Sequence, residues 1–160
     1  MKKTLLTEYE LYDDATGLAP EDAALLEEAR SHTHLSYAPY SHFNVAAAAR
    51  LQDGTIVYGA NQENASYPVG ICAERTLLST ISSQFPKEKA VTIAITYSSQ
   101  HAESNHPVGP CGMCRQTLLE YEHRWGQPVR MILAGLQGKV LIVNSAADIL
   151  PFNFTAGDMA

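Results

Sequence analysis

Apolar residues recur with two different periods along this chain, and the shorter period predicts strands. From Phe43 to Leu51 every second residue is apolar, which is the pattern of a strand with one buried face. Asp53-Gly54, a dipeptide typical of tight hairpins, precedes the expected return strand at 56–60. Continuous apolar runs predict three further strands, at residues 91–97, 129–134 and 139–143.

The longer period predicts three helices. The first begins at Pro20, where proline and two acidic residues suit the first turn, and it is expected to extend until Pro39. The second begins near Cys72, has apolar residues three or four positions apart, and stops at Pro86. The third begins at Cys111. Between these helices lie polar loops rich in Asn, Pro, Ser and Gly.

A hairpin followed by alternating strands and helices predicts an α/β fold with three layers, α/β/α. Helices would cover both faces of a mixed five-stranded sheet. Residues 1–19 have no clear period and are expected to form an N-terminal extension, and 20–160 would form the domain. Acidic residues between 8 and 14 exclude the apolar core of a signal peptide. No apolar run approaches the roughly 20 residues of a membrane span, so we expect a cytoplasmic protein with no membrane partner.

Composition and charge narrow the class of partner. Hydrophobic residues make up 46% of the chain and charged residues 18%, which is typical of a globular protein. The formal net charge is −6 and the 11 basic residues are scattered. Binding to a phosphate backbone depends on clustered Lys and Arg, so nucleic acid is excluded as the expected partner. A small, neutral or weakly charged substrate fits better.

The three cysteines carry the candidate chemistry. Cys72 is followed two residues later by Glu74, and Cys111 and Cys114 form a Pro-Cys-x-x-Cys motif. The start of a helix favours the thiolate, and the i, i+3 spacing puts Cys111 and Cys114 on one helix face. Three thiolates can hold one Zn²⁺ per chain and leave its fourth tetrahedral position open, as in catalytic zinc sites. Glu74 would then move protons beside the open position, as in zinc deaminases of nucleobases.

Other interpretations of these cysteines exist. Cys-x-x-Cys alone is also a redox motif, and a lone cysteine is often a small core residue. A structural zinc would need a fourth ligand, for which a histidine between 101 and 106 is the candidate. A redox pair leaves Pro110, Cys72 and Glu74 unexplained together. The sequence therefore favours catalytic zinc.

Four segments together resemble the homotetrameric cytidine deaminases. The resemblance extends from about Pro20 to Phe154, which is nearly the whole chain. Cys-Ala-Glu with Pro-Cys-x-x-Cys is shared by several deaminases, and Asn-x-Glu-Asn is the part that indicates a nucleoside. The segments are 36–43 (Ser-Tyr-Ala-Pro-Tyr-Ser-His-Phe), 61–68 (Asn-Gln-Glu-Asn-Ala-Ser-Tyr-Pro), 72–76 (Cys-Ala-Glu-Arg-Thr) and 110–116 (Pro-Cys-Gly-Met-Cys-Arg-Gln).

The resemblance implies binding roles for several residues. Asn61 and Glu63 would hydrogen-bond the ribose hydroxyls, although a polar turn after a strand is the plain alternative. Phe43 would flank the pyrimidine, although it is as easily a core residue of its strand. Backbone groups around Ala73 would hold the base.

Arg75 resembles an arginine that hydrogen-bonds a zinc-bound thiolate and withdraws some of its charge, with a surface salt bridge as the alternative. Phe154 matches a phenylalanine that reaches the site of a neighbouring subunit. The resemblance therefore implies a homotetramer with shared active sites.

The implied reaction is the hydrolytic deamination of cytidine and 2′-deoxycytidine to uridine and 2′-deoxyuridine, with release of ammonia. Zinc would activate the water, and Glu74 would transfer protons in pyrimidine salvage. One alternative is a deaminase of a related amine, such as a nucleoside of the blasticidin S type or a free base. Another is a non-enzymatic zinc-binding interaction domain, in which Glu74 would have no task.

Two departures from the family pattern affect the expected pocket. Ala46 stands where the family usually has glycine, and its methyl group is expected near the pocket floor. The loop 99–109 is long and carries His101 and His106. It lies either over the site or at a subunit contact.

Overall fold

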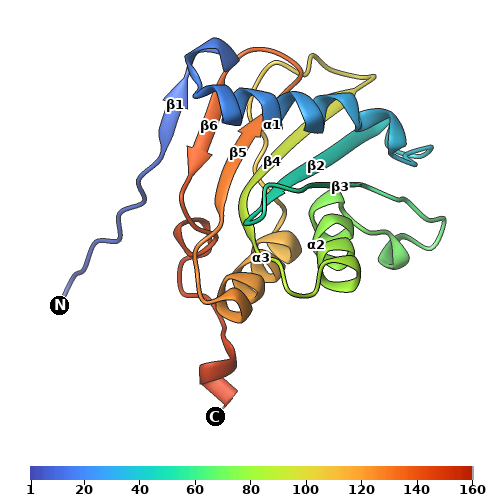
Figure 1. Ribbon diagram of the computed structural model, residues 1–160. Coiled ribbons are helices and arrows are strands. Elements are labelled where there is room, and N and C mark those ends of the chain that lie inside the picture. The colour runs from blue at the N-terminus through green and yellow to red at the C-terminus, as the bar shows by residue number, and fades with distance from the viewer. Residues whose placement is uncertain (160) are drawn as a thin grey trace.

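The computed structural model describes residues 1–159, which form one mixed sheet with helices on both faces (Figure 1). The strands are β1 (Glu10–Tyr12), β2 (Phe43–Leu51), β3 (Ile56–Ala60), β4 (Ala90–Ser99), β5 (Arg130–Ala134) and β6 (Val140–Val143). The α-helices are α1 (Pro20–Ser31), α2 (Ala73–Gln84) and α3 (Gly112–Trp125). Short 3₁₀ turns lie at Ala15–Gly17, Thr33–Leu35, Tyr67–Val69, Ala147–Ile149 and Ala156–Met159.

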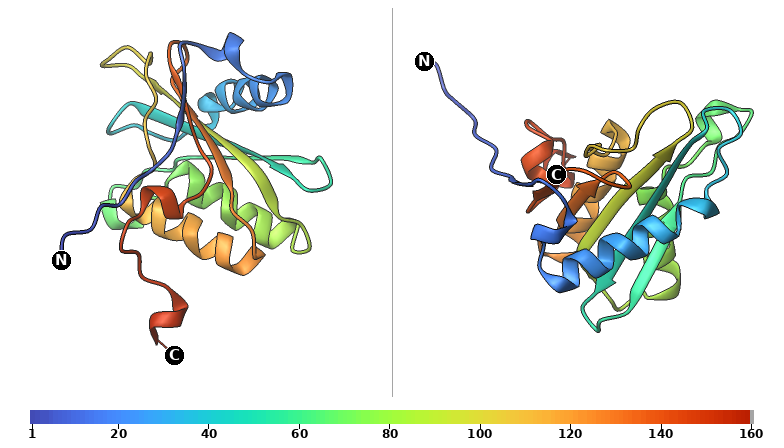
Figure 2. Two further views of the ribbon diagram at one scale, coloured as in Figure 1. Left: turned by 90° about the vertical axis from the view of Figure 1, so that its left-hand side faces the viewer. Right: turned by 90° about the horizontal axis from the view of Figure 1, so that it is seen from above.

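The sheet has the order β1-β6-β5-β4-β2-β3. Only β4 and β5 pair in parallel, and the other neighbours within residues 1–159 are antiparallel. Helix α1 covers one face, and α2 and α3 lie side by side on the other, as both views of Figure 2 show. The predicted α/β/α architecture with a mixed sheet is therefore confirmed. Among the residues described, no helix has the length and apolar character needed to cross a membrane.

Each face of the sheet has its own apolar core. Between α1 and the sheet, Leu25, Leu26 and Ala29 pack on inward-facing strand residues. The larger core lies under α2 and α3 and includes Leu77 and Leu118, both fully buried. Helix α2 also lies very close to β3. A Cβ atom at Gly59 on β3 would lie 2.4 Å from the backbone nitrogen of Leu77 on α2, so only glycine fits there. This approach fixes the height of α2 above the sheet.

Two sequence predictions about elements are wrong in detail. The sheet has six strands instead of five, because Glu10–Tyr12, inside the predicted extension 1–19, pairs with β6. The first helix ends at Ser31 and does not continue until Pro39; a 3₁₀ turn at Thr33–Leu35 follows it. A three-residue edge strand is too short to show a period, and the proline marks the latest possible end of a helix, not its actual end.

Strand direction places the two functional helices together. Both β3 and β4 are antiparallel to β2, so they run in the same direction. Helix α2 follows β3 and α3 follows β4, and both helices therefore begin beyond the carboxyl ends of these strands. This edge of an open α/β sheet is where ligands usually bind.

Candidate active site and metal centre

The three cysteines converge where α2 and α3 begin. Cys72 and Cys111 are the N-cap residues of the two helices, and Cys114 lies in the first turn of α3. The Sγ atoms of Cys72 and Cys111 are 3.9 Å apart, and those of Cys111 and Cys114 are 3.5 Å apart. All three sulfurs lie within 4.8 Å of one another. Sulfurs bound to one tetrahedral zinc at about 2.3 Å lie about 3.8 Å apart, so these thiols fit the ion.

The residues in this cluster distinguish a catalytic zinc site from a structural one. All three cysteines are free thiols, and among residues 1–159 no histidine joins them. The predicted alternative of a fourth ligand from residues 101–106 is therefore not found in the part of the chain described. A site with three protein ligands keeps one position for water or substrate, which is the arrangement of catalytic zinc.

The thiols differ in acidity. Hydrogen bonding to the Cys114 thiol lowers the pKa of Cys72 to about 6. The same interaction, together with burial, raises the pKa of Cys114. The Cys72 thiol is thus more easily ionised than the Cys114 thiol. Metal binding to such a set releases protons.

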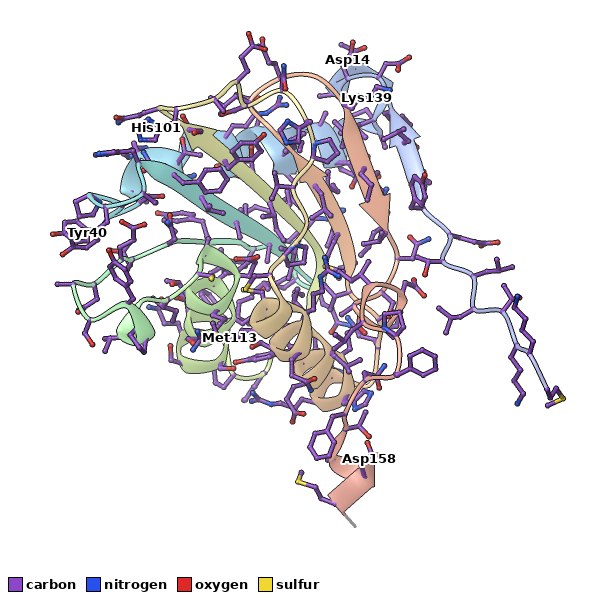
Figure 3. All side chains as sticks on the ribbon, turned by 180° about the vertical axis from the view of Figure 1, so that it is seen from behind. Asp14, Tyr40, His101, Met113, Lys139 and Asp158 are labelled. Carbon is purple, nitrogen blue, oxygen red and sulfur yellow. The ribbon has the colours of Figure 1, made fainter. Side chains whose placement is uncertain are left out.

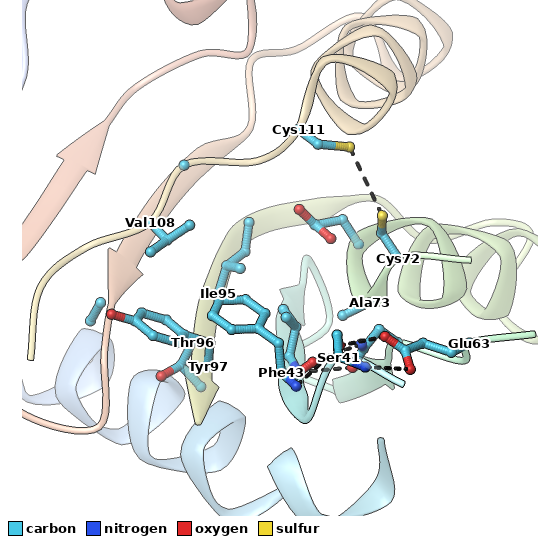
Figure 4. Close-up of a pocket in the computed structure, with 15 residues that line it drawn as sticks. Ser41, Phe43, Glu63, Cys72, Ala73, Ile95, Thr96, Tyr97, Val108 and Cys111 are labelled. Atoms are coloured by element: carbon cyan, nitrogen blue, oxygen red, sulfur yellow. Dashed lines mark hydrogen bonds between the residues drawn. The ribbon is translucent and has the colours of Figure 1, made fainter. Parts of the chain in front are cut away.

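Glu74 lies in the first turn of α2, two residues after Cys72, and its side chain is buried at 5% exposure. Burial raises the pKa of its carboxyl group, because the charged form is poorly solvated there. Glu74 lines the same cavity as Cys72 and Cys111, whose sulfurs face each other in Figure 4. A carboxyl group with a raised pKa can both accept and return a proton near neutral pH.

Cys72, Cys111 and Glu74 lie at one end of a cavity of about 430 Å³, and Cys114 is next to the two cysteines. This volume is within the range of small-molecule sites. Strands β2 and β4 supply the floor, α2 one wall, and the segment before α3 the opposite wall. The residues that line it are Ser41, Phe43, Val45, Asn61, Glu63, Cys72, Ala73, Glu74, Ile95, Thr96, Tyr97, Val108, Gly109, Cys111 and Ala134.

The predicted ribose-binding pair is at the other end of this cavity. The Glu63 carboxylate accepts a hydrogen bond from the hydroxyl of Ser41, as Figure 4 shows. It also accepts one from the backbone N–H of Tyr40 at 2.9 Å. The Ser41 hydroxyl is the main reason that the pKa of Glu63 is low. Asn61 accepts the N–H of Val45 at 2.8 Å and donates to the carbonyl of Phe43 at 3.0 Å. Asn61 therefore fixes the backbone that carries Phe43, and it keeps one N–H and one lone pair for a ligand.

Phe43 and Ala73 line the cavity, and the structure also relocates Ala46. Val45 points into the cavity, so the next side chain along the strand, that of Ala46, points to the opposite face. Ala46 is fully buried there and pairs in register with Ala60 and Thr96. The expectation that its methyl group lies near the pocket floor is therefore wrong.

Arg75 and Phe154 lie outside the cavity lining. The charge of Arg75 contributes to the low pKa of Cys72, and within residues 1–159 Arg75 forms neither a hydrogen bond nor a salt bridge through its side chain. The side chain of Phe154 is 56% exposed, and its carbonyl accepts a hydrogen bond from Gln116 at 2.8 Å. Phe154 thus does not reach the cavity of its own chain.

Sequence reasoning missed several cavity residues. Ser41 holds Glu63, and Tyr97 stacks on Phe43 with 4.9 Å between ring centroids. Val108 closes the wall before α3. Tyr97 ends the apolar run at 91–97, and the sequence predicts it only as a strand residue. Its place in the cavity depends on pairing with β2, which no local pattern shows.

The loop after β4 lies beside the cavity. Val108 and Gly109 line the cavity wall, and His106 contacts the hydroxyl of Tyr97 at 3.2 Å. The ring of His101 lies 5.4 Å from that of His42. Figure 3 shows His101 and Tyr40 on the same flank of the molecule. The loop 99–109 therefore lies at the site, which is one of the two places predicted for it.

Residues 20–125 match the family model described as "Cytidine and deoxycytidylate deaminase zinc-binding region". The chain belongs to this family. The match contains all three cysteines and Glu74, so the metal for which the thiol geometry is suited is zinc.

Relatives in this deaminase family cover most of the chain. A cytidine deaminase of Halalkalibacterium halodurans is 38% identical over 135 residues, which are 84% of this chain and 95% of the relative. The crystal structure of a cytidine deaminase from Burkholderia pseudomallei has a TM-score of 0.70 and 35% identity, and the match covers 86% of this chain and 100% of that one. A blasticidin-S deaminase of Bacillus cereus is 27% identical over 140 residues, 86% of this chain and 95% of the relative.

Proposed function

We propose that this protein is a zinc-dependent hydrolase that deaminates cytidine and 2′-deoxycytidine to uridine and 2′-deoxyuridine, with release of ammonia. One observation carries the proposal: two thiols of the three-cysteine cluster and a buried glutamate share a cavity with an asparagine and a second glutamate. The first set suits hydrolysis at an exocyclic amine, and the second suits the hydroxyls of a sugar. The similarity to cytidine deaminases over most of both chains supports the same substrate class.

The chemistry at the amine end depends on Glu74. Zinc, when held by the three thiolates, supplies a Lewis acid that lowers the pKa of the attacking water. Glu74 accepts a proton from this water and delivers it to N3 of the ring as the oxygen attacks C4. The same carboxyl group then takes the remaining proton from the hydroxyl at C4 and delivers it to the amino group, so that the C4 oxygen becomes the carbonyl of uridine and the amine leaves as ammonia. Burial raises the pKa of this carboxyl group, which favours its taking up a proton between the two transfers.

The rest of the cavity orients the nucleoside. Glu63 and Asn61 hold the ribose hydroxyls, and the Phe43 ring lies against the pyrimidine. Ala73 offers backbone groups at the start of α2, where N–H groups lack helical partners. Arg75 draws charge away from the Cys72 thiolate and so makes the zinc a better Lewis acid. These contacts place C4 at the thiols and N3 beside Glu74.

Three alternative functions are weaker. The blasticidin-S deaminase relative is 27% identical, whereas the cytidine deaminase relative reaches 38% over a similar length. A non-enzymatic zinc domain would leave Glu74 buried at a cavity without a partner for its charge, which is costly. A free base would leave Asn61 and Glu63 without hydroxyls to bind.

We also propose that the protein acts as a cytoplasmic homotetramer in pyrimidine salvage, with Phe154 contributing to the site of a neighbouring subunit. Two large apolar side chains near the C-terminus, Phe152 and Phe154, are exposed in the single chain. Apolar side chains exposed together often mark subunit contacts. The free nucleoside is the small-molecule partner. Because the basic residues are scattered, we do not expect the protein to bind nucleic acid.

The test is turnover, followed by ultraviolet absorbance, on cytidine, 2′-deoxycytidine, cytosine, adenosine and blasticidin S, with zinc measured on the same sample. We expect about one zinc per chain and the fastest turnover on the two cytosine nucleosides. Faster turnover of blasticidin S than of cytidine would show that blasticidin S, and not cytidine, is the substrate. Full cytidine deamination by protein without zinc would contradict the mechanism.

A further inference from the structure

We propose that Tyr97, anchored by His106, is a specificity-determining residue that limits the room at the C5–C6 edge of the pyrimidine. This inference rests on the proposed deamination of cytidine and deepens it. It concerns a wall of the cavity that contains neither a predicted metal ligand nor a predicted ribose-binding residue. The wall is formed by β4 and by residues 108–109 of the loop that follows it.

Strand pairing aims Tyr97 into the cavity. Tyr97 on β4 is directly opposite Val45 on β2, and residues opposite each other in an antiparallel pair project to the same face. Both line the cavity, and Tyr97 is only 3% exposed. Its ring lies nearly parallel to that of Phe43, with an angle of 19° and 4.9 Å between centroids. Phe43 and Tyr97 thus form a stacked aromatic pair, and both residues line the cavity.

The hydroxyl of Tyr97 is held at the far end of its ring. It lies 3.2 Å from Nδ1 of His106, and the two rings meet edge to face. A phenol that is both stacked and hydrogen-bonded has little freedom to turn. Tyr97 is therefore held at both ends, by Phe43 and by His106.

The loop that carries His106 is itself fixed to the sheet. Gln137 donates its N–H to the carbonyl of Ser104 at 3.2 Å, and the Ser104 hydroxyl accepts the N–H of Ser99 at 3.0 Å. Two glycines allow this contact. A Cβ atom at Gly135 would lie 2.2 Å from the Ser104 carbonyl oxygen, and one at Gly138 would lie 2.1 Å from that of Asn105. The backbone next to His106 is thus seated directly on the turn between β5 and β6.

The orientation of the substrate places this wall at C5. In a cytosine ring C4 has N3 on one side and C5 on the other. With C4 at the thiols and N3 beside Glu74, C5 lies on the side away from α2. Figure 4 shows Val108 and Tyr97 on the side of the cavity opposite Ala73. A substituent at C5 would meet these two side chains, and Tyr97 is the larger.

The experiment compares kcat/KM for cytidine, 5-methylcytidine and 5-iodocytidine in the zinc-loaded wild-type protein and in Tyr97→Ala. A difference of one methylene in an apolar pocket changes kcat/KM by about 10- to 200-fold. We therefore expect Tyr97→Ala to raise the ratio of 5-iodocytidine to cytidine by about 10-fold or more. Zinc content and thermal unfolding are measured on the same samples. If Tyr97→Ala does not fold, Tyr97→Leu replaces it, because leucine keeps apolar bulk and removes the ring.

Two variants test the anchor. Tyr97→Phe keeps the ring and loses the hydrogen bond, and His106→Ala loses the same bond from the other side. Each should raise KM for cytidine with a smaller change in kcat, and the double variant should be no worse than either single one. His101→Ala is the matched control, because its ring faces His42 instead of Tyr97. A purely structural role of the loop would lower stability without this shared effect on KM.

The outcomes separate the two proposals. Wild-type protein that binds zinc and leaves cytidine unchanged contradicts the proposed function. If the wild type deaminates cytidine, but folded Tyr97→Ala or Tyr97→Leu keeps the wild-type ratio between substrates, the inference about Tyr97 alone is overturned. Additive effects of Tyr97→Phe and His106→Ala would overturn the anchoring role of His106.

Discussion

Glu74 is the residue on which the proposed chemistry depends most. It is buried beside the thiols, and its pKa is raised for that reason. Glutamine has nearly the same shape as glutamate but cannot accept and return a proton. The side chain is not among the three predicted zinc ligands, so its chemistry can be separated from metal binding.

We therefore expect Glu74→Gln to keep its zinc and its melting temperature and to lose turnover on cytidine by about 10²-fold or more. Metal analysis, thermal unfolding and steady-state kinetics on one sample check this. A variant that deaminates cytidine at close to the wild-type rate would show that another group moves the proton.

Glu63 gives a second prediction at this scale. If its carboxylate binds a ribose hydroxyl, Glu63→Ala should reduce kcat/KM for cytidine by about 10- to 100-fold, as expected for a hydrogen bond to a charged group. Its effect on any activity toward free cytosine should be much smaller. Ser41→Ala is the matched control, since it removes only one of the donors that hold this carboxylate. An equal loss for nucleoside and free base would contradict a role in binding ribose.

At the scale of elements, a buried glutamate near the end of α3 joins three segments. Glu122 accepts the N–H of Val129 at 2.8 Å, the N–H of Ala146 at 2.8 Å and the hydroxyl of Ser145 at 2.8 Å. It is 6% exposed and lies far along α3 from the cysteines. Its carboxylate ties the helix to the start of β5 and to the segment after β6.

We expect Glu122→Ala to lower the free energy of unfolding by about 3 kcal/mol or more, because it leaves two buried N–H groups without acceptors. Urea denaturation measures the change. Glu120→Ala, an exposed position on the same helix, should change stability by less than about 0.5 kcal/mol. Equal stability of the two variants would show that water satisfies the N–H groups.

Periodicity predicted the elements well wherever burial is one-sided and the run is long. Strand β2 and helix α2 are found close to their predicted bounds, because alternation and helical spacing report directly which face is buried. Strand β1 has three residues and depends on β6 for its place, so no local signal marks it. The cysteines and Glu74 were found because their chemistry has a fixed spacing. Ser41 and Tyr97 were missed because only folding brings them to the cavity.

At the scale of the whole molecule, the C-terminal segment is tied to the helix that carries two of the cysteines. Arg115 donates to the carbonyl of Ile149 at 2.9 Å, and Gln116 donates to that of Phe154 at 2.8 Å. Both donors lie within the first turns of α3. The segment leaves the body of the molecule beyond this point (Figure 1). Its aromatic side chains are thus presented outward from a fixed base.

If Phe154 enters a neighbouring site, Phe154→Ala should lower kcat/KM for cytidine by about 10-fold, as expected for loss of an aromatic contact in a binding pocket. It keeps the backbone hydrogen bond from Gln116. Trimming the chain after Leu150 should damage both activity and assembly, which size-exclusion chromatography with light scattering would measure. Phe152→Ala is the comparison for an exposed aromatic that is not predicted to enter a site. A fully active monomer would remove Phe154 from catalysis.

The position of the thiols has a consequence for the folding of the chain. Cys72 and Cys111 are 39 residues apart, and a metal ion bound to both closes the chain between them into a ring. By the chain-entropy relation for cross-links, a ring of this size restricts the unfolded chain by about 4 kcal/mol. The ring contains all of β4 and the loop that follows it, and therefore both Tyr97 and His106. The ion that would activate water thus also acts as a clasp, and its loss would loosen the wall proposed to select the substrate.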